Sequence, residues 1–540
     1  MLDRKQVQLD IARFSRSNST WLGDYMIDSK GWFLALLIGH FIGWCCLVDA
    51  VAYGQTTKPA GWAALQLADQ VLADKGVNKC YSIDFASYHT SLVDLPIGVF
   101  DSGVGGLTVL ETLLTYDQHN NATGMPGADG VPDFQNERFL YLGDQANMPY
   151  GNYSAAGKED YLRELIMKDA IFLLGNRYWS SKKATEPSFD KPPVKAIVIA
   201  CNTATAYGLD DIRAATERWE LPVMVVGVVE AGADSFVQEL ALDGPPSAVA
   251  VMATAGTCSS GAYPKAILRA AGLAGKRSPL VWQQGSLGLA GAIEGNSAFV
   301  TSTLQPGETT SIKLEASLPS AYMGPAVNNI RAPIDIALAD TYGFDPKGLI
   351  GKLERPETWR LNSVVNYVRY DVTTLVEGYR QSGAKQPLEK IILGCTHFPY
   401  EASRILQSLE RLREYRNETG EQPYRELIAR HVTLIDPGLL TARQLYRQLF
   451  IQRLLIRGEL QRKPIVERIF ISVPTPTVAD SDLAIDGGLS VEYKYGRAAG
   501  SLGQEDTRFV PLTVDQLPEV LINLLKSHCP NIWAIASQQK

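Results

Sequence analysis

The chain has 540 residues, 46% of them hydrophobic, and a formal net charge of −7 at pH 7. This length and hydrophobic content suffice for two globular domains with complete cores. The acidic balance and the lack of a long basic run exclude nucleic acid as the main partner, because neutralising phosphate groups requires clustered lysine and arginine.

The first predicted element is an uncharged apolar segment, residues 32–48, which reads WFLALLIGHFIGWCCLV. It is short for a membrane span, and small residues follow it up to Ala52, as in a secretory signal. We expect residues 1–54 to be a signal peptide or a membrane anchor, and residues 55–94 to be an N-terminal extension. The protein is then periplasmic or membrane-anchored; if the start or the signal is misread, it is cytoplasmic.

From Leu95 onward, strand-like and helix-like stretches alternate, which predicts an α/β fold with largely parallel sheets. Pro96 to Phe100 reads as a strand, and leucines at helical spacing follow it from Leu107. Residues 101–106, DSGVGG, lie between them and match neither a phosphate loop nor a dinucleotide fingerprint. The backbone amides of such a turn could hold a small carboxylate.

Two later segments are nearly the same. Residues 195–204 read KAIVIACNTA, and residues 389–398 read EKIILGCTHF. Each pattern predicts a buried strand that ends at a cysteine, Cys201 in the first segment and Cys395 in the second. Apolar residues at helical spacing follow both cysteines. These are Leu209, Ile212, Ala215 and Trp219 after the first, and Ala402, Ile405, Leu406, Leu409 and Leu412 after the second.

We therefore expect both thiols to lie where a strand meets a helix N-terminus, a position that favours a ligand site and the thiolate form. A single cysteine in such a place is more typical of a small buried hydrophobe than of a reactive thiol. Polar neighbours oppose that interpretation, because a plain core would not contain Asn202, Thr203, Thr396 and His397 around the sulfurs. The chain has seven cysteines without CxxC spacing, so we expect neither a disulfide scaffold nor a metal site.

Four motifs in register resemble those of glutamate racemase, within the aspartate/glutamate racemase superfamily. They are residues 101–108 (DSGVGGLT), 143–151 (GDQANMPYG), 200–204 (ACNTA) and 394–399 (GCTHFP). The resemblance runs from about Leu95 to about Gly438 and is interrupted by additions at 117–134, 179–193 and 295–387.

The resemblance implies two pseudo-symmetric open α/β sandwich domains with the active site between them. Residues 95–220, with 435–540 returning to them, would form one domain, and residues 221–434, with an insertion at about 295–387, the other. It also implies a cofactor-independent racemase that interconverts L- and D-glutamate through two cysteines and supplies D-glutamate for peptidoglycan. The implied partner is the small amino acid alone; a homodimer is one option for the assembly.

Residue by residue, the resemblance assigns catalytic roles to Cys201, Cys395, Asp101, His397 and Glu294, the last of which could instead be a solvated helix carboxylate. It assigns substrate binding to Ser102, Pro149, Tyr150, Gly151, Asn202, Thr203 and Thr396. Asp144 is better interpreted as a carboxylate that organises its own turn before Pro149.

Three alternatives stay open. The fold and thiols also suit a racemase of aspartate or another acidic amino acid. An exported amino-acid-binding protein would keep the pocket without turnover. A hydrolase using Cys395 and His397 is disfavoured, because residues this close in sequence seldom align an imidazole on the neighbouring sulfur.

Overall fold

The computed structural model describes residues 61–74, 80–89, 91–240, 247–296, 299–300, 334–352, 354–456, 464–484, 487–501 and 503–538. The predicted signal or anchor at 32–48 lies outside these ranges, as does 301–333 of the predicted insertion. Residues 60–540 form one compact unit. Among the described helices, none combines the length and the apolar character that crossing a membrane requires.

A six-stranded sheet has the order β12-β11-β2-β1-β3-β4. Its pairs are parallel except for the antiparallel pair of β11 and β12. The strands are β1 (Ile97–Asp101), β2 (Arg138–Gly143), β3 (Ala196–Ile199), β4 (Met224–Gly227), β11 (Ile465–Pro474) and β12 (Thr507–Pro511).

Helices cover both faces of this sheet. On one face, α3 (Trp62–Asp74), α5 (Glu159–Leu174) and α6 (Asn202–Arg218) pack against side chains such as Phe100 and Ile199. On the other, α4 (Leu107–Thr115), α14 (Pro437–Gln452), α16 (Glu519–His528) and α17 (Pro530–Ala536) pack against residues such as Val99 and Val198. Neighbouring strand residues thus point to opposite cores, which explains the unbroken apolar runs in the sequence.

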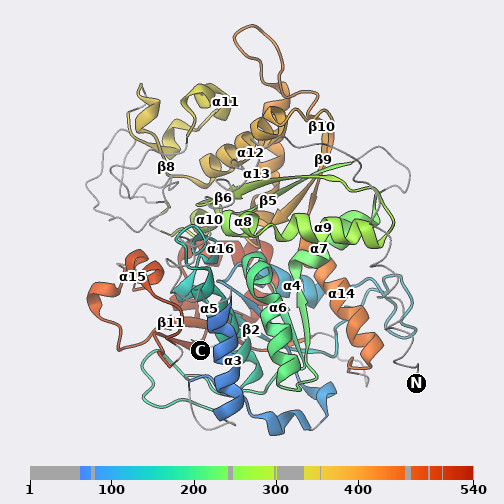
Figure 1. The fold of residues 1–540 in the computed structure, drawn as a ribbon, viewed down its shortest axis with the longest axis vertical. Helices are drawn as coiled ribbons and strands as arrows, with labels where there is room; N and C mark the ends of the chain where they lie inside the picture. Colours follow the sequence, from blue (N-terminus) through green and yellow to red (C-terminus); the bar gives the residue numbers. More distant parts are fainter. Residues whose placement is uncertain are drawn as a thin grey trace, which may run out of the picture. The chain divides into compact units, whose positions relative to one another are not determined.

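A parallel four-stranded sheet has the order β10-β9-β5-β6. Its strands are β5 (Ala248–Thr254), β6 (Leu280–Ser286), β9 (Leu388–Gly394) and β10 (Ile428–Ile435). Helices α7 (Val228–Gln238) and α9 (Ala262–Leu273) cover one face, and α10 (Leu289–Ile293), α12 (Val364–Gln381) and α13 (Ala402–Glu414) cover the other. In Figure 1 these strands lie above α7, α8 (Ala255–Ser260) and α9, and α3, α5 and α6 lie below.

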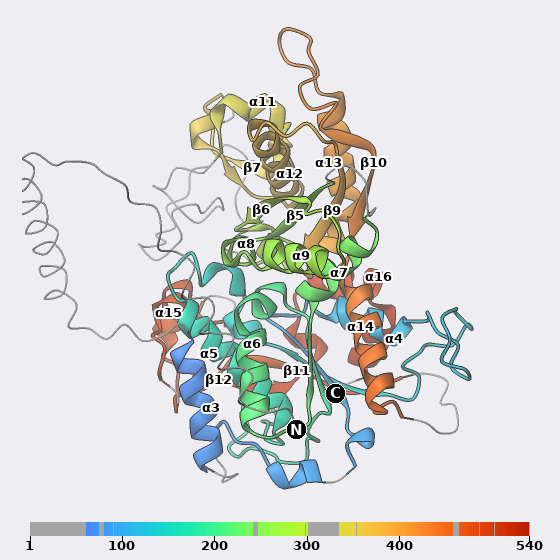
Figure 2. The same ribbon diagram turned by 45° about the vertical axis from the view of Figure 1, so that its right-hand side comes forward.

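The predicted α/β class is confirmed by these two sheets with helices on both faces. β4 follows the predicted domain boundary at residue 220, yet it pairs with β3 of the six-stranded sheet. The division into two domains stays a prediction. The smaller elements are α11 (Ala339–Tyr342), α15 (Val491–Gly496) and the antiparallel pair of β7 (Leu349–Ile350) and β8 (Arg360–Leu361), and Figure 2 shows α11 and β7 beside α12.

The two helices predicted after the cysteines form as α6 and α13. All four apolar residues of the first predicted stripe are buried. In the second, Ile405, Leu409 and Leu412 are buried, whereas Leu406 is 41% exposed, so its inclusion was wrong. An apolar stripe at 3.6-residue spacing cannot always bury both of two adjacent apolar residues. Leu406 follows the buried Ile405 and lies at the edge of the stripe.

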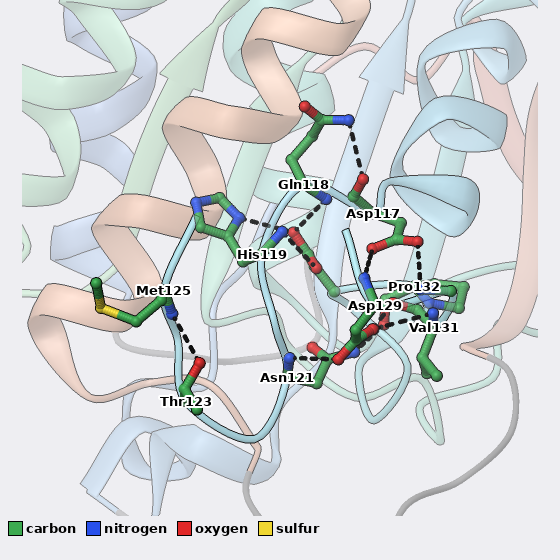
Figure 3. A network of polar contacts seen from close by, with 11 residues as sticks. Asp117, Gln118, His119, Asn121, Thr123, Met125, Asp129, Val131 and Pro132 are labelled. Carbon is green, nitrogen blue, oxygen red and sulfur yellow. Dashed lines mark hydrogen bonds and ion pairs between the residues drawn. The ribbon is translucent and has the colours of Figure 1, made fainter. Parts of the chain in front are cut away.

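The predicted addition at 117–134 is a loop held by its own carboxylates (Figure 3). Asp117 accepts hydrogen bonds from the backbone amides of Asp129 and Gly130, and Asp129 accepts one of 2.7 Å from the amide of Asn121. His119 lies 2.8 Å from Asp133. The acidic residues of this loop therefore act as internal hydrogen-bond acceptors.

Candidate active site

A small pocket lies where the carboxyl ends of strands from both sheets meet. Both cysteines line it, although they come from different sheets. With the single exception of Glu294, every site residue predicted from the sequence contributes to the lining. The full lining is Asp101, Ser102, Met148, Pro149, Tyr150, Gly151, Cys201, Asn202, Thr203, Thr254, Ala290, Gly394, Cys395, Thr396 and His397.

Cys201 is the N-cap residue of α6, as the strand-to-helix pattern predicts. Its Sγ accepts a hydrogen bond of 3.3 Å from the backbone amide of Ala204. Burial and then the nearby carboxylate of Asp101 raise the pKa of the Cys201 thiol well above its ordinary value. Although the helix terminus opposes this shift, Cys201 rests as the neutral thiol.

Asp101 ends β1 and is fully buried. The backbone amides of Ser102 and Gly106 donate to its two oxygens, at 2.8 and 2.5 Å. Two amides of the glycine-rich turn therefore hold the chain's own carboxylate; that this turn could also hold a ligand's carboxylate stays a prediction. Burial raises the pKa of Asp101, against the lowering effect of His397.

Cys395 follows β9, but α13 begins only at Ala402, after a short 3₁₀ turn over Phe398–Glu401. The expectation of a helix N-terminus at this thiol was wrong, because Pro399 lies in this turn and cannot donate a backbone hydrogen bond there. An imidazole takes the place of the helix dipole: Nδ1 of His397 lies 3.7 Å from Sγ of Cys395.

Glu294 completes the group of side chains around Cys395. Its Oε1 lies 2.7 Å from Nε2 of His397, and its side chain is 4% exposed, so it is not the solvated carboxylate that the sequence left open. Burial lowers the pKa of His397, but hydrogen bonds to Cys395 and Glu294 outweigh it and raise that pKa well above its ordinary value. His397 is therefore an imidazolium, which favours negative charge on Cys395.

Asp101 and Glu294 each accept a hydrogen bond from a residue that follows a strand of the opposite sheet. The hydroxyl of Thr396, which follows β9, donates to Oδ2 of Asp101 at 3.1 Å. The amide of Gln145, which follows β2, donates to Oε2 of Glu294 at 2.8 Å. The two halves of the site thus fix each other's carboxylates.

Two further bonds join the halves at Asn202 and Thr203, which are predicted to bind substrate. The hydroxyl of Tyr263 donates to Oδ1 of Asn202 at 2.6 Å, which leaves the nitrogen of that amide as a donor. The hydroxyls of Thr203 and Thr254 lie 2.8 Å apart.

One rim of the pocket is the stretch from Asp144 to Gly151. Asp144 accepts hydrogen bonds from the amide of Asn147 and the hydroxyl of Tyr150, so its predicted role in organising this turn is confirmed. The Tyr150 hydroxyl also lies 2.7 Å from Asp169. Burial and then the charge of Asp144 raise the pKa of Asp169 well above its ordinary value, so Asp169 carries a proton and the pair shares one charge. Tyr150 offers the pocket its ring, since these carboxylates occupy its hydroxyl.

Sequence reasoning missed several lining residues and Gln145. Gln145 and Met148 lie within the quoted motif at 143–151, but their side chains carried no signal of their own. Thr254 did carry a signal in the sequence, because it ends a buried strand and caps the next helix as Cys201 does. Cys258, a third thiol near this end, is outside the pocket lining.

No family model matches the chain. Part of it is similar to curated glutamate racemases. The one from Lysinibacillus sphaericus is 34% identical over 176 residues, covering 33% of this chain and 49% of the relative. The one from Rippkaea orientalis is 32% identical over 206 residues, covering 38% of this chain and 54% of the relative. The chain thus spans about half the length of the curated relatives it matches.

A solved structure of glutamate racemase isoform RacE1 from Bacillus anthracis is 21% identical and covers 70% of this chain and 88% of its own. Its TM-score is 0.39, a likeness too weak to support a conclusion about the function of this chain.

Proposed function

We propose that this chain is an amino-acid racemase that inverts the α-carbon of glutamate. The observation that carries the proposal is the pair of buried thiols, Cys201 and Cys395, which line one pocket from two different sheets. Inversion at a carbon requires one group that removes the α-proton and another that returns a proton on the opposite face. The chain supplies both groups, so the proposed chemistry is independent of a cofactor. The similarity to curated glutamate racemases supports the choice of glutamate.

The surroundings of the two thiols differ. Cys201 begins as a thiol beside Asp101, whereas the imidazolium of His397 lies 3.7 Å from Sγ of Cys395, where it would stabilise the negative charge of a base. Cys395 is therefore the base for one enantiomer, and Cys201 is the acid.

The α-carbon loses one proton from one face and gains one proton on the other face. The Cys395 thiolate takes the α-proton, and the electron pair of the broken C–H bond moves into the substrate carboxylate. The Cys201 thiol then donates its proton to the other face of the α-carbon, which leaves Cys201 as a thiolate. The reverse reaction starts from that state. The enzyme resets when Cys395 loses the proton that it took and Cys201 regains one; Asp101, with its raised pKa, is the neighbouring group that can pass a proton to the Cys201 thiolate.

The residues that line the pocket include neither lysine nor arginine, and the one imidazolium among them, His397, lies against Cys395, so neutral donors would hold the substrate carboxylates. The hydroxyls of Ser102 and Thr203 and the amide of Asn202 are such donors. Hydrogen bonds fixed in a water-poor pocket stabilise the developing negative charge more than the same groups would in water.

A cysteine hydrolase is the second candidate. Nδ1 of His397 lies 3.7 Å from Sγ of Cys395, and Glu294 holds the other ring nitrogen, so the objection drawn from sequence spacing was wrong. A hydrolase would not need Cys201. Racemisation that disappears in Cys201→Ala, while hydrolysis of glutamine by the wild-type chain is absent, would reject this candidate.

The test of the proposal incubates the reduced protein with L-glutamate or L-aspartate in deuterium oxide, without added cofactor. We expect loss of optical rotation and α-deuteration with glutamate, and at least tenfold slower reaction with aspartate. Faster reaction with aspartate would change the substrate. Saturable glutamate binding without exchange would identify an amino-acid-binding protein instead.

In this proposal the enzyme supplies D-glutamate for peptidoglycan, and residues 1–54 direct it to the periplasm or anchor it to the membrane. Fractionation of cells that express the whole chain with a C-terminal tag tests the location.

A further inference from the structure

A long excursion of the chain joins two neighbouring strands. β11 and β12 are antiparallel partners, which a turn of a few residues suffices to join. The connection instead runs over residues 475–506 and contains α15. Excursions of this length inside a compact unit are commonly functional. In both views α15 lies beside α5 (Figures 1 and 2).

Two residues of α15 contact the main chain of the rim. Nζ of Lys494 donates a hydrogen bond of 2.6 Å to the carbonyl of Met148, and the hydroxyl of Tyr495 donates one of 3.3 Å to the carbonyl of Pro149. Both Met148 and Pro149 line the pocket. These bonds therefore fix the backbone of two lining residues rather than a surface loop.

Arg497 extends the contact to the preceding residue of the rim. Its Nη2 donates to Oδ1 of Asn147, whose amide nitrogen in turn donates to Asp144. Asp506 pairs with Nη1 of Arg497 at 3.5 Å. The guanidinium thus ties the turn that Asp144 organises to the excursion.

Lys494 is only 8% exposed. Burying an ammonium group costs free energy unless it is hydrogen-bonded, and a charged donor makes a stronger bond to a carbonyl than a neutral one does. Lys494 makes this charge-assisted bond to the carbonyl of Met148, so its charge helps to hold the backbone of the pocket rim in place.

The excursion is itself anchored on α5. The amide of Gly500 donates a bond of 2.7 Å to Oε2 of Glu164 in the middle of that helix. One turn further along α5, Asp169 holds the hydroxyl of Tyr150. Residues 147–150 are therefore held by α5 on one side and by the excursion on another.

We propose that residues 491–497, named here the clamp, set the substrate affinity of the pocket by holding Met148 and Pro149 in place. Lys494 and Tyr495 are positioning residues, since they touch the rim and not the reacting atoms. The proposal rests on the proposed function, because the pocket must bind a substrate for its rim to matter.

The test compares two variants of the clamp with a matched control. Lys494→Met removes the charged donor, and Tyr495→Phe removes only a hydroxyl. Lys191→Met is the control, because Lys191 is also buried and donates to main-chain carbonyls, those of Leu173 and Pro192, away from the pocket. Two experiments use the full chain: steady-state kinetics, which give KM and kcat for glutamate, and hydrogen exchange of the amides in residues 144–153.

We expect Lys494→Met to raise KM about tenfold and kcat to change less than threefold, which is the loss of about one charge-assisted bond. Exchange in residues 144–153 should rise at least tenfold. Tyr495→Phe should raise KM two- to fivefold, and Lys494→Arg should restore most of the wild-type KM. Lys191→Met should lower thermal stability without changing KM.

Unchanged exchange in both clamp variants, or the same rise of KM in Lys191→Met, would overturn the proposal. If the wild-type chain racemises no amino acid, the proposed function fails, but the exchange measurement needs no substrate. It then still decides whether the clamp holds the rim.

Discussion

The side-chain amide of Gln145 and the carboxylate of Glu294 are joined by a hydrogen bond of 2.8 Å that crosses from one sheet to the other. Gln145 follows β2 of the six-stranded sheet, and Glu294 follows α10 beside the four-stranded one. Because Glu294 also holds His397, which lies against Cys395, the orientation of the imidazole depends on a residue from the opposite half of the site.

Gln145→Ala should therefore lower kcat about tenfold, because Glu294 loses the donor that orients it. The loss should not add to that of Glu294→Gln, since both changes act on the same imidazole. Steady-state kinetics of the two single variants and the double variant measure this. Gln118→Ala, which removes an amide from the loop at 117–134, is the control and should leave kcat unchanged. Additive losses would show that Gln145 acts elsewhere.

Gly105→Ala should abolish activity while leaving most of the fold intact. A Cβ atom at Gly105 would lie 2.4 Å from Cε1 of His397, so the imidazole must move away from Cys395. We expect at least a hundredfold loss of kcat and a loss of about 1 to 3 kcal/mol in unfolding free energy, as for overpacking. Gly272→Ala, in α9, is the control: apart from its chain neighbours and the backbone of its own helix, no heavy atom of the described residues lies within 4 Å of its Cβ position. A Gly105→Ala enzyme with wild-type kcat would contradict the position of His397.

Asp371 should make the stability of the protein depend on pH. It is fully buried on α12, and burial raises its pKa from 3.8 to about 7, against the lowering effect of the Ser286 and Gln284 side chains. The folded state then binds this proton more tightly than the unfolded state does. The stability from this group is complete below the unfolded pKa and is lost as the pH rises through 7.

Asp371→Asn should consequently stabilise the protein relative to the wild type by about 2 to 3 kcal/mol more at pH 8 than at pH 5. Urea unfolding at both pH values measures the difference. Asp340→Asn, which removes an exposed carboxylate, controls for the change in net charge. An equal effect of Asp371→Asn at both pH values would mean that Asp371 is charged throughout.

Local patterns in the sequence predicted the strands and helices that carry the cysteines, because apolar runs and helical spacing depend on neighbouring residues. The four motifs likewise predicted most of the residues that line the pocket, but not Thr254 or Ala290. The thiol at Cys395 shows the limit of this reasoning. Its sequence resembles that of Cys201, but Pro399 replaces the helix N-terminus with a 3₁₀ turn, and an imidazole supports the thiol instead.

Contacts between distant segments could not be predicted. Gln145 and Glu294 are 149 residues apart, and Lys494 is 346 residues from Met148. No periodicity links such pairs, since each depends on how the two sheets and the excursion between β11 and β12 pack. The inclusion of Leu406 in the apolar stripe was wrong for a different reason: helical spacing gives the direction of a buried face but not its width.

The most direct test of the account follows D- and L-glutamate separately in deuterium oxide with Cys201→Ala and Cys395→Ala. Cys258→Ala is the control, because this thiol lies near the site but outside the pocket lining. We expect both pocket variants to lose racemisation by at least about a thousandfold, as for removal of a general acid or base, and the control to keep it. Each pocket variant should still exchange the α-hydrogen of one enantiomer without inversion, and the two variants should select opposite enantiomers. Racemisation that survives in either pocket variant, or exchange of the same enantiomer by both, would contradict a mechanism with one thiol on each face of the substrate.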